Sequence, residues 1–244
     1  MTKPIAVCSL SGGLDSSVLA YYMKSKGYDL RLLSFDYGQR HRRELESAKA
    51  IAESLGAPWQ LVDLTSLTKL LKGSALTDSS VDVPFGHYTL ESQKLTVVPN
   101  RNMIFASILA GYVISEKAQV LSLGVHASDY LTYPDCRPDF VDRLEGIILS
   151  GNEGFIDPKF KVLTPLLNFS KTEVLRAAHD LGVPIEKTWS CYVGEDKVCG
   201  KCGTCQEIIE SADILSAERG ITFEEAYPHF AGVDLAEARL LMKA

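Results

Sequence analysis

The sequence has no apolar run long enough to form a membrane-spanning helix. The longest such run covers residues 103–114 and is interrupted by Ser107 and Gly111, whereas a helix needs about 20 apolar residues to cross a bilayer. The amino-terminal residues also lack the charged flank, apolar core and small-residue cleavage site of a secretion signal. We therefore expect a cytoplasmic protein with no membrane partner.

Positive charge is scarce. The chain of 244 residues has 25 Lys and Arg against 31 Asp and Glu, a net charge of −6. A broad nucleic-acid-binding face needs clustered basic residues, and the basic cluster in this sequence is confined to residues 40–43. We therefore expect no nucleic-acid partner. Because positive charge is unfavourable at a helix start, that cluster is consistent with an anionic ligand nearby.

The glycine-rich turn near the amino terminus lacks the lysine of a Walker loop and the three-glycine spacing of a dinucleotide fingerprint. It lies between an apolar run at residues 5–10 and an apolar-periodic helix that follows, so a strand, a tight turn and a helix start succeed one another. Such a turn points backbone N–H groups and the positive helix end at one spot, which suits a phosphate. The alternative is an ordinary turn in which Ser or Asp caps the helix.

The rhythm of strands and helices predicts an α/β fold with a doubly wound, five-stranded parallel sheet. Ligands on such sheets bind outside the carboxyl ends of the strands, where Asp15, Asp36 and Tyr37 fall. Residues 73–98 interrupt the rhythm and are expected to form a loop or lid. The expected strands are residues 5–10, 30–35, 59–64, 120–125 and 162–166, and the main helices are residues 42–55, 102–117, 138–149 and 170–181.

Four of the six cysteines crowd together at Cys191, Cys199, Cys202 and Cys205. Four thiolates match the closed tetrahedral coordination of structural zinc, although an iron–sulfur cluster also takes four cysteines. We favour one structural Zn²⁺ per chain, because nothing else in the sequence suggests redox chemistry. The zinc would hold in place the carboxy-terminal segment, which has few apolar residues. The expected organisation is an ATP-binding domain over residues 1–185 and a small zinc-binding region over residues 186–244, with short helices around residues 207–218 and 234–242.

Several strings of residues carry a resemblance to known proteins. Residues 11–16, Ser-Gly-Gly-Leu-Asp-Ser, resemble the SGGxDS pyrophosphate loop of N-type ATP pyrophosphatases, the PP-loop proteins. With residues 35–41, 98–102, 133–138 and 190–192 and the cysteine cluster, in the same order, the chain resembles the 7-cyano-7-deazaguanine synthase family of queuosine and archaeosine biosynthesis. The resemblance covers about residues 5–206. Residues 206–210 depart from the family, because they are acidic where a basic residue and an aromatic usually stand.

This resemblance implies an adenine-nucleotide α-hydrolase-like fold, zinc on the four cysteines and a homodimer. It also implies an ATP-dependent ligase that converts 7-carboxy-7-deazaguanine and ammonia into the nitrile through an adenylated carboxylate and an amide. On this hypothesis Asp15, Lys171 and Arg101 are catalytic, with Lys171 and Arg101 balancing phosphate charge. Asp129 or Asp135 would bind the guanine-like edge, and Tyr133 or Arg137 would position the substrate. ATP with Mg²⁺ would be held by Asp36, Tyr37 and the turn residues Ser9, Leu10, Ser11, Gly12, Gly13, Leu14, Asp15, Ser16 and Ser17.

Three other functions fit parts of the sequence. A related ligase could stop at the amide or couple the deazaguanine acid to another amine, which the acidic residues 206–210 suggest. A tRNA-modifying relative is also conceivable, although the negative charge counts against it. The last alternative is a zinc-stabilised nucleotide-binding module without catalysis.

Overall fold

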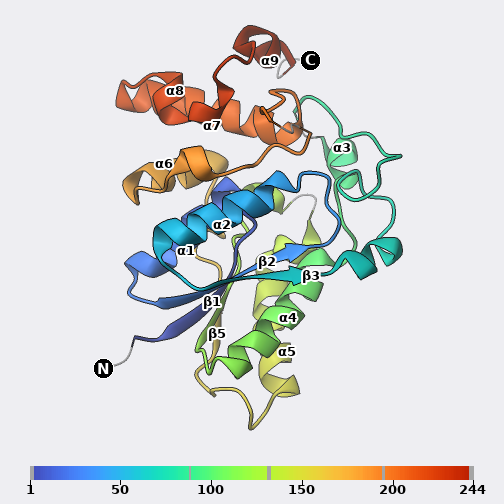
Figure 1. The fold of residues 1–244 in the computed structure, drawn as a ribbon, viewed down its shortest axis with the longest axis vertical. Helices are drawn as coiled ribbons and strands as arrows, with labels where there is room; N and C mark the ends of the chain where they lie inside the picture. The colour runs from blue at the N-terminus through green and yellow to red at the C-terminus, as the bar shows by residue number, and fades with distance from the viewer. Residues whose placement is uncertain (1–2, 88, 131–132, 194–195, 242–244) are drawn as a thin grey trace.

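Five parallel strands form the central sheet of the computed structural model, which describes residues 3–87, 89–130, 133–193 and 196–241 (Figure 1). The strands are β1 (Ile5–Ser9), β2 (Asp29–Asp36), β3 (Trp59–Asp63), β4 (Val120–Ser122) and β5 (Lys161–Leu163). Their order is β3-β2-β1-β4-β5, with every neighbouring pair parallel. The chain order therefore reverses between β1 and β4, which is where such sheets bind ligands. The predicted fold class is confirmed.

Helices cover both faces of the sheet (Figure 1). Side chains alternate between the faces of a strand, so Ala6 and Cys8 of β1 pack in one apolar cluster and Val7 packs in another. The first cluster includes residues of α1 (Leu14–Ser25), α2 (Arg43–Leu55) and α6 (Lys171–Asp180). The second includes residues of α4 (Arg101–Ser115) and α5 (Pro138–Gly151). Both faces are thus buried, as a parallel sheet requires.

The carboxy-terminal region begins its main helix earlier than predicted. The helix α7 (Gly203–Arg219) includes Cys205, and it is followed by the unpredicted α8 (Phe223–Ala226) and by α9 (Leu235–Leu241). The expectation that this tail has few apolar residues to bury is wrong, because Ile209, Leu215 and Tyr227 are almost fully buried. They belong to the same apolar cluster as α1 and α6. The division of the chain at residues 185 and 186 stays a prediction.

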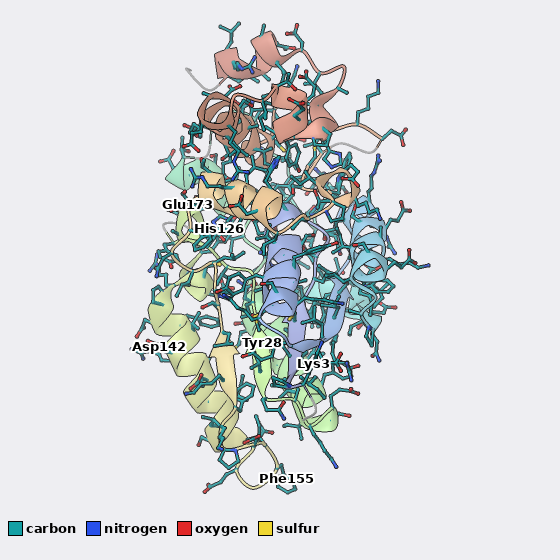
Figure 2. The ribbon with its side chains drawn as sticks, turned by 90° about the vertical axis from the view of Figure 1, so that its left-hand side faces the viewer. Lys3, Tyr28, His126, Asp142, Phe155 and Glu173 are labelled. Atoms are coloured by element: carbon teal, nitrogen blue, oxygen red, sulfur yellow. The ribbon has the colours of Figure 1, made fainter. Side chains whose placement is uncertain are left out.

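The segment from residue 73 to residue 98 contains a short helix, α3 (Leu90–Lys94). It reaches the cysteine-rich region, since Phe85 and Cys202 form an isolated antiparallel bridge and the Gly86 N–H donates to the Lys201 carbonyl at 2.8 Å. Figure 2 shows His126 beside α6 and Phe155 at the end of the molecule remote from the carboxy-terminal helices. In the described part of the chain, no helix combines the length and the apolar character needed to cross a bilayer.

Candidate active site

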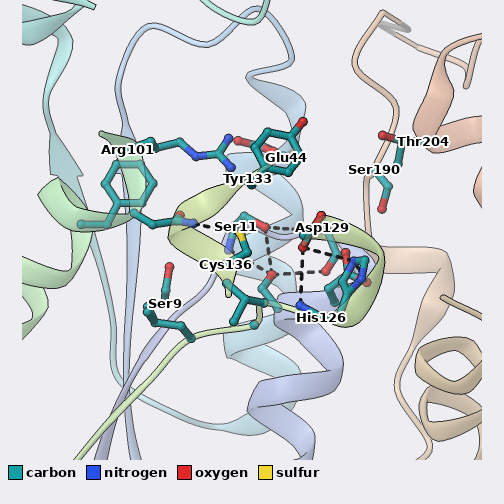
Figure 3. Close-up of a pocket in the computed structure, with 18 of the residues that line it drawn as sticks. Ser9, Ser11, Glu44, Arg101, His126, Asp129, Tyr133, Cys136, Ser190 and Thr204 are labelled. Carbon is teal, nitrogen blue, oxygen red and sulfur yellow. Dashed lines mark hydrogen bonds and ion pairs between the residues drawn. The ribbon is translucent and has the colours of Figure 1, made fainter. Parts of the chain in front are cut away.

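A cavity of about 210 Å³ opens at the carboxyl ends of β1, β2 and β4 (Figure 3). Its walls come from the turn after β1, the residues after β4, the start of α4, the start of α6 and the segment around the cysteine cluster. From the predicted nucleotide-binding turn, the residues that line the cavity are Ser9, Leu10, Ser11, Gly13, Asp15 and Ser16. The sequence therefore placed the turn correctly at a cavity on the ligand-binding edge of the sheet.

The turn is closed by its own serines. Ser11 and Ser16 are joined through their hydroxyls at 2.9 Å, and the Ser17 hydroxyl donates to the Gly13 carbonyl at 2.7 Å. Gly13 is the residue that precedes α1, and its position has no side-chain cap. The Ser or Asp cap expected for an ordinary turn is therefore wrong. Gly12 has a φ of +92°, and a Cβ there would lie 2.0 Å from the Glu44 carbonyl oxygen, so only glycine fits between the turn and α2.

A second segment supports the turn from outside. The Trp189 N–H donates to the Gly12 carbonyl at 2.8 Å, and the Leu14 N–H donates to the Ser190 hydroxyl at 3.2 Å. Ser190 precedes the first clustered cysteine, and both Trp189 and Ser190 line the cavity. The region that carries the cysteines is thus part of the cavity wall.

Asp15 and Lys171 form an ion pair inside the cavity. The Lys171 Nζ lies 2.8 Å and 2.9 Å from the two carboxylate oxygens of Asp15 and 3.1 Å from the His126 Nε2. Burial alone would raise the pKa of Asp15, but Lys171 and His126 outweigh it and hold that pKa well below its usual range. Burial alone would lower the pKa of Lys171, but Asp15 holds it above its usual range. Both groups are therefore charged at neutral pH.

Two residues of this region were missed by sequence reasoning. His126 is 3% exposed, and its Nε2 lies 3.6 Å from a carboxylate oxygen of Asp15 and 3.6 Å from one of Asp129. Glu207 comes from the acidic segment after the last clustered cysteine, and it also lines the cavity. Burial raises the pKa of Glu207, an effect that Lys171 partly offsets. His126 directly follows a predicted strand, which is the signal that could have identified it, whereas the signal for Glu207 was the acidic departure of residues 206–210 from the family.

The opposite part of the cavity is aromatic. Phe35 and Phe105 stack with ring centroids 4.1 Å apart, and Tyr37 lies against Phe105 at 5.5 Å. The Tyr37 hydroxyl accepts a hydrogen bond from Arg101, and burial raises the pKa of Tyr37 to about 12. Tyr133 and Gln93 also line the cavity, the latter from the segment predicted to be a lid. Planar rings of a ligand would pack well against these walls.

Six of the predicted site residues do not line the cavity, namely Gly12, Leu14 and Ser17 of the turn and Asp36, Asp135 and Arg137. Asp36 is bound by Arg42 at 2.5 Å and by the Gly38 N–H at 3.2 Å. Asp135 accepts a hydrogen bond from the Asn102 N–H at 3.2 Å, and the exposed Arg137 donates to the Tyr130 carbonyl at 2.8 Å. Among the predicted substrate-binding residues, Asp129 and Tyr133 are the two that line the cavity.

The four clustered cysteines lie beside the cavity. Their sulfur atoms all lie within 4.8 Å of one another, an arrangement that could hold a metal ion. The Cys199 and Cys205 sulfurs are 3.9 Å apart, close to the spacing of about 3.8 Å that tetrahedral coordination with Zn–S bonds of about 2.3 Å requires. Backbone N–H groups of Cys199, Lys201 and Cys202 point at the sulfurs of Cys191 and Cys199, as is usual around metal-bound thiolates.

The fold and this site define an α/β protein with a doubly wound, five-stranded parallel sheet, a cavity at the carboxyl ends of its strands and a cysteine cluster that could bind a metal. A more specific assignment comes from comparison with known proteins. The family described as "Queuosine biosynthesis protein QueC" matches residues 5–211, and this chain belongs to it. The resemblance read from the sequence motifs is thereby confirmed.

Individual relatives agree with the family. A protein of Brucella anthropi named 7-cyano-7-deazaguanine synthase is 46% identical over 224 residues, which cover 92% of this chain and 94% of that protein. A protein of the same name from Brucella ovis is 42% identical over the same shares of the two chains. Among solved structures, an NH3-dependent NAD synthetase from Campylobacter jejuni covers 100% of this chain and 86% of its own, at 12% identity and a TM-score of 0.46.

Proposed function

We propose that this protein converts 7-carboxy-7-deazaguanine, ammonia and ATP into 7-cyano-7-deazaguanine. The observation that carries the proposal is the Asp15–Lys171 pair beside the glycine-rich turn, in one cavity with an aromatic wall that suits a planar base. The family and the names of its members support the same activity. A homodimer and a cytoplasmic location belong to the proposal as well.

The chemistry needs an activated carboxylate. A carboxylate resists nucleophiles because of its charge and resonance. Attack of a carboxylate oxygen on the α-phosphorus of ATP, with pyrophosphate as the leaving group, gives an acyl-adenylate that has neither obstacle. Ammonia then attacks the acyl carbon, AMP leaves with the former carboxylate oxygen and a proton is lost, which gives the amide. A second activation of the amide oxygen allows its departure and the loss of two protons from nitrogen, which gives the nitrile.

The amides of the turn and Lys171 are the groups that we assign to the phosphates. A triphosphate that approaches Asp15 would meet a carboxylate, so the proposal includes Mg²⁺ between ATP and this part of the chain. Preorganised N–H groups and cations stabilise charge that develops during phosphoryl transfer. We assign the guanine-like edge of the substrate to Asp129 rather than to Asp135, because Asp129 lines the cavity.

Structural zinc on Cys191, Cys199, Cys202 and Cys205 completes the proposal. The sulfur spacing fits this ion, and a closed set of four thiolates leaves no open position for catalysis. The ion would fix the segment that brings Ser190 and Glu207 to the cavity. Its contribution is therefore the shape of the site.

The direct test is incubation of the protein with ATP, ammonium and 7-carboxy-7-deazaguanine, with the products read by mass spectrometry. The expected product is the nitrile, accompanied by pyrophosphate release. The position of Glu207 in the cavity favours one alternative, a ligase that stops at the amide or uses another amine. Accumulation of the amide, or a product that retains an added amine, would establish that alternative and overturn nitrile synthesis.

A further inference from the structure

Arg101 stands in an unfavourable place for a cation. It is the first residue of α4, and the positive end of a helix disfavours positive charge. The preceding Asn100 has a φ of +58°, in the left-handed region that few residues other than glycine adopt. Backbone strain of this kind persists where the surrounding structure enforces it, commonly at functional sites. Arg101 directly follows this left-handed residue and lines the cavity.

The neighbours of Arg101 do not neutralise it. Its principal electrostatic neighbours are the phenols of Tyr37, Tyr192 and Tyr133 and the thiol of Cys136. Burial raises the pKa of Tyr133 and of Cys136, as it does that of Tyr37, so these three groups are uncharged at neutral pH. A guanidinium, in contrast, always carries its charge in proteins.

No carboxylate in the described parts of the chain forms an ion pair with Arg101. Glu44 lines the same cavity, but its carboxylate is bound to Gln39 at 2.9 Å and to His41 at 3.2 Å. Lys171 differs in this respect, because Asp15 already neutralises it. The cavity thus contains one cation with a built-in counterion and another without.

We infer that Arg101 binds the carboxylate of the acid substrate, with the heterocycle of that substrate against the aromatic wall of the cavity. This inference rests on the proposed function and replaces the phosphate-balancing role expected from the sequence. A planar guanidinium pairs with a carboxylate through two parallel hydrogen bonds. The Arg101 side chain lies well away from His126 in Figure 3, whereas Tyr133 lies close to it in that view. The Lys171 Nζ lies 3.1 Å from the His126 Nε2.

The neutral amide intermediate makes the inference testable. If Arg101 binds the carboxylate, its loss lowers kcat/KM for the acid, which carries the charge. The same loss has little effect on kcat/KM for the amide, which is neutral. If Arg101 instead balances phosphate charge, its loss lowers kcat/KM equally for the acid and the amide, because both reactions consume ATP. Arg101→Met removes the charge at similar length, and Arg101→Lys retains a charge without the planar fork.

We expect Arg101→Met to lower kcat/KM for 7-carboxy-7-deazaguanine about 100-fold and that for the corresponding amide less than about 5-fold. ATP affinity, measured by calorimetry without the acid, should change less than about 3-fold. The kcat/KM of Arg101→Lys for the acid should lie between the values of the wild type and Arg101→Met. The matched control is Arg143→Met, since Arg143 is exposed on α5 and pairs only with Asp139 among the described residues.

Stability provides a second measurement. Burying a charge without a counterion costs free energy, so the melting temperature of ligand-free Arg101→Met should not fall. The acid should raise the melting temperature of the wild type and not that of Arg101→Met. Equal losses with acid and amide, or weaker ATP binding by the variant, would overturn the inference. If the wild type makes no nitrile, the proposed function fails, and binding of the acid to the two proteins still decides the role of Arg101.

Discussion

Lys171 and Asp15 connect two helices that are remote in sequence. The Lys171 Nζ lies 2.8 Å and 2.9 Å from the two Asp15 carboxylate oxygens, across a separation of 156 residues. Asp15 belongs to the first turn of α1, and Lys171 is the first residue of α6. A cation at the start of α6 is unfavourable for that helix, and the Asp15 carboxylate compensates for it. The Asp15 carboxylate is therefore the anion that neutralises Lys171 in the ligand-free protein.

The first prediction concerns the loss of this ion pair. Asp15→Asn leaves the buried Lys171 ammonium without its carboxylate, so the free energy of unfolding should fall by about 2 to 4 kcal/mol. Lys171→Met should cost a similar amount, and the double variant should cost less than the sum of the two. Urea denaturation measures all three. Additive losses would mean that the two groups do not stabilise one another, and retention of ATP-dependent turnover by Asp15→Asn would remove Asp15 from catalysis.

Acid stability gives a second prediction. The folded-state pKa of Asp15 is lowered, so its ion pair contributes stability at pH values above the unfolded pKa of about 3.9 and loses it as pH falls further. The difference in unfolding free energy between the wild type and Asp15→Asn should therefore be fully present at about pH 5, where His126, whose pKa Asp15 helps to raise, is also protonated. Below pH 4 that difference should shrink. A difference that persists unchanged at pH 3 would contradict the lowered pKa.

Two adjacent glycines should respond differently to the same substitution. Gly12→Ala places a Cβ 2.0 Å from the Glu44 carbonyl oxygen and 2.5 Å from the Ala48 nitrogen, both backbone atoms of α2. This overlap and the positive φ should lower the free energy of unfolding by at least about 3 kcal/mol. Gly13→Ala is the matched control, because its φ is −73° and its nearest neighbour would be 3.5 Å away.

Gly13→Ala should leave stability unchanged or raise it by about 0.5 kcal/mol. Its new methyl group would point toward the cavity that we assign to phosphate, so ATP affinity should fall although the protein stays folded. Chemical denaturation and ATP titration of the two variants separate these effects. Equal stability of the two variants would show that the turn does not press against α2.

Metal content is the subject of a fourth prediction. Elemental analysis should find one zinc ion per chain, and Cys202→Ser should lose it, because Cys202 is fully buried in the cluster. Since Ser190 and Glu207 reach the cavity from the same segment, the metal-free protein should bind ATP more weakly as well as unfold more easily. Iron in place of zinc would favour the iron–sulfur alternative. Unchanged ATP binding by the metal-free protein would show that the cysteine cluster does not shape the active site.

The sequence predicted those features that local patterns determine. The apolar run at residues 5–10 predicted a strand, which the structure buries on both faces, and the glycine-rich turn was placed at the correct edge of the sheet. The sequence did not predict the positions of residues that depend on long-range packing. Glu207 reaches the cavity because α7 packs on α6, and the contact between His126 and Lys171 spans 45 residues. No short window of sequence contains both partners of such contacts.

The last prediction separates two aspartates that the sequence could not distinguish. Asp129 and Asp135 both lie between β4 and α5, and short 3₁₀ turns at Ala127–Asp129 and Pro134–Cys136 decide which one reaches the cavity. Asp129 lines it, whereas Asp135 accepts a hydrogen bond from the Asn102 N–H at the start of α4. Asp129→Asn should therefore raise KM for the deazaguanine acid at least about tenfold, because a charged hydrogen bond contributes about 1.5 to 3 kcal/mol. Asp135→Asn should instead lower the melting temperature and leave KM within about threefold. Steady-state kinetics and thermal denaturation of both variants measure this contrast, and the reverse pattern would assign the guanine-like edge to Asp135.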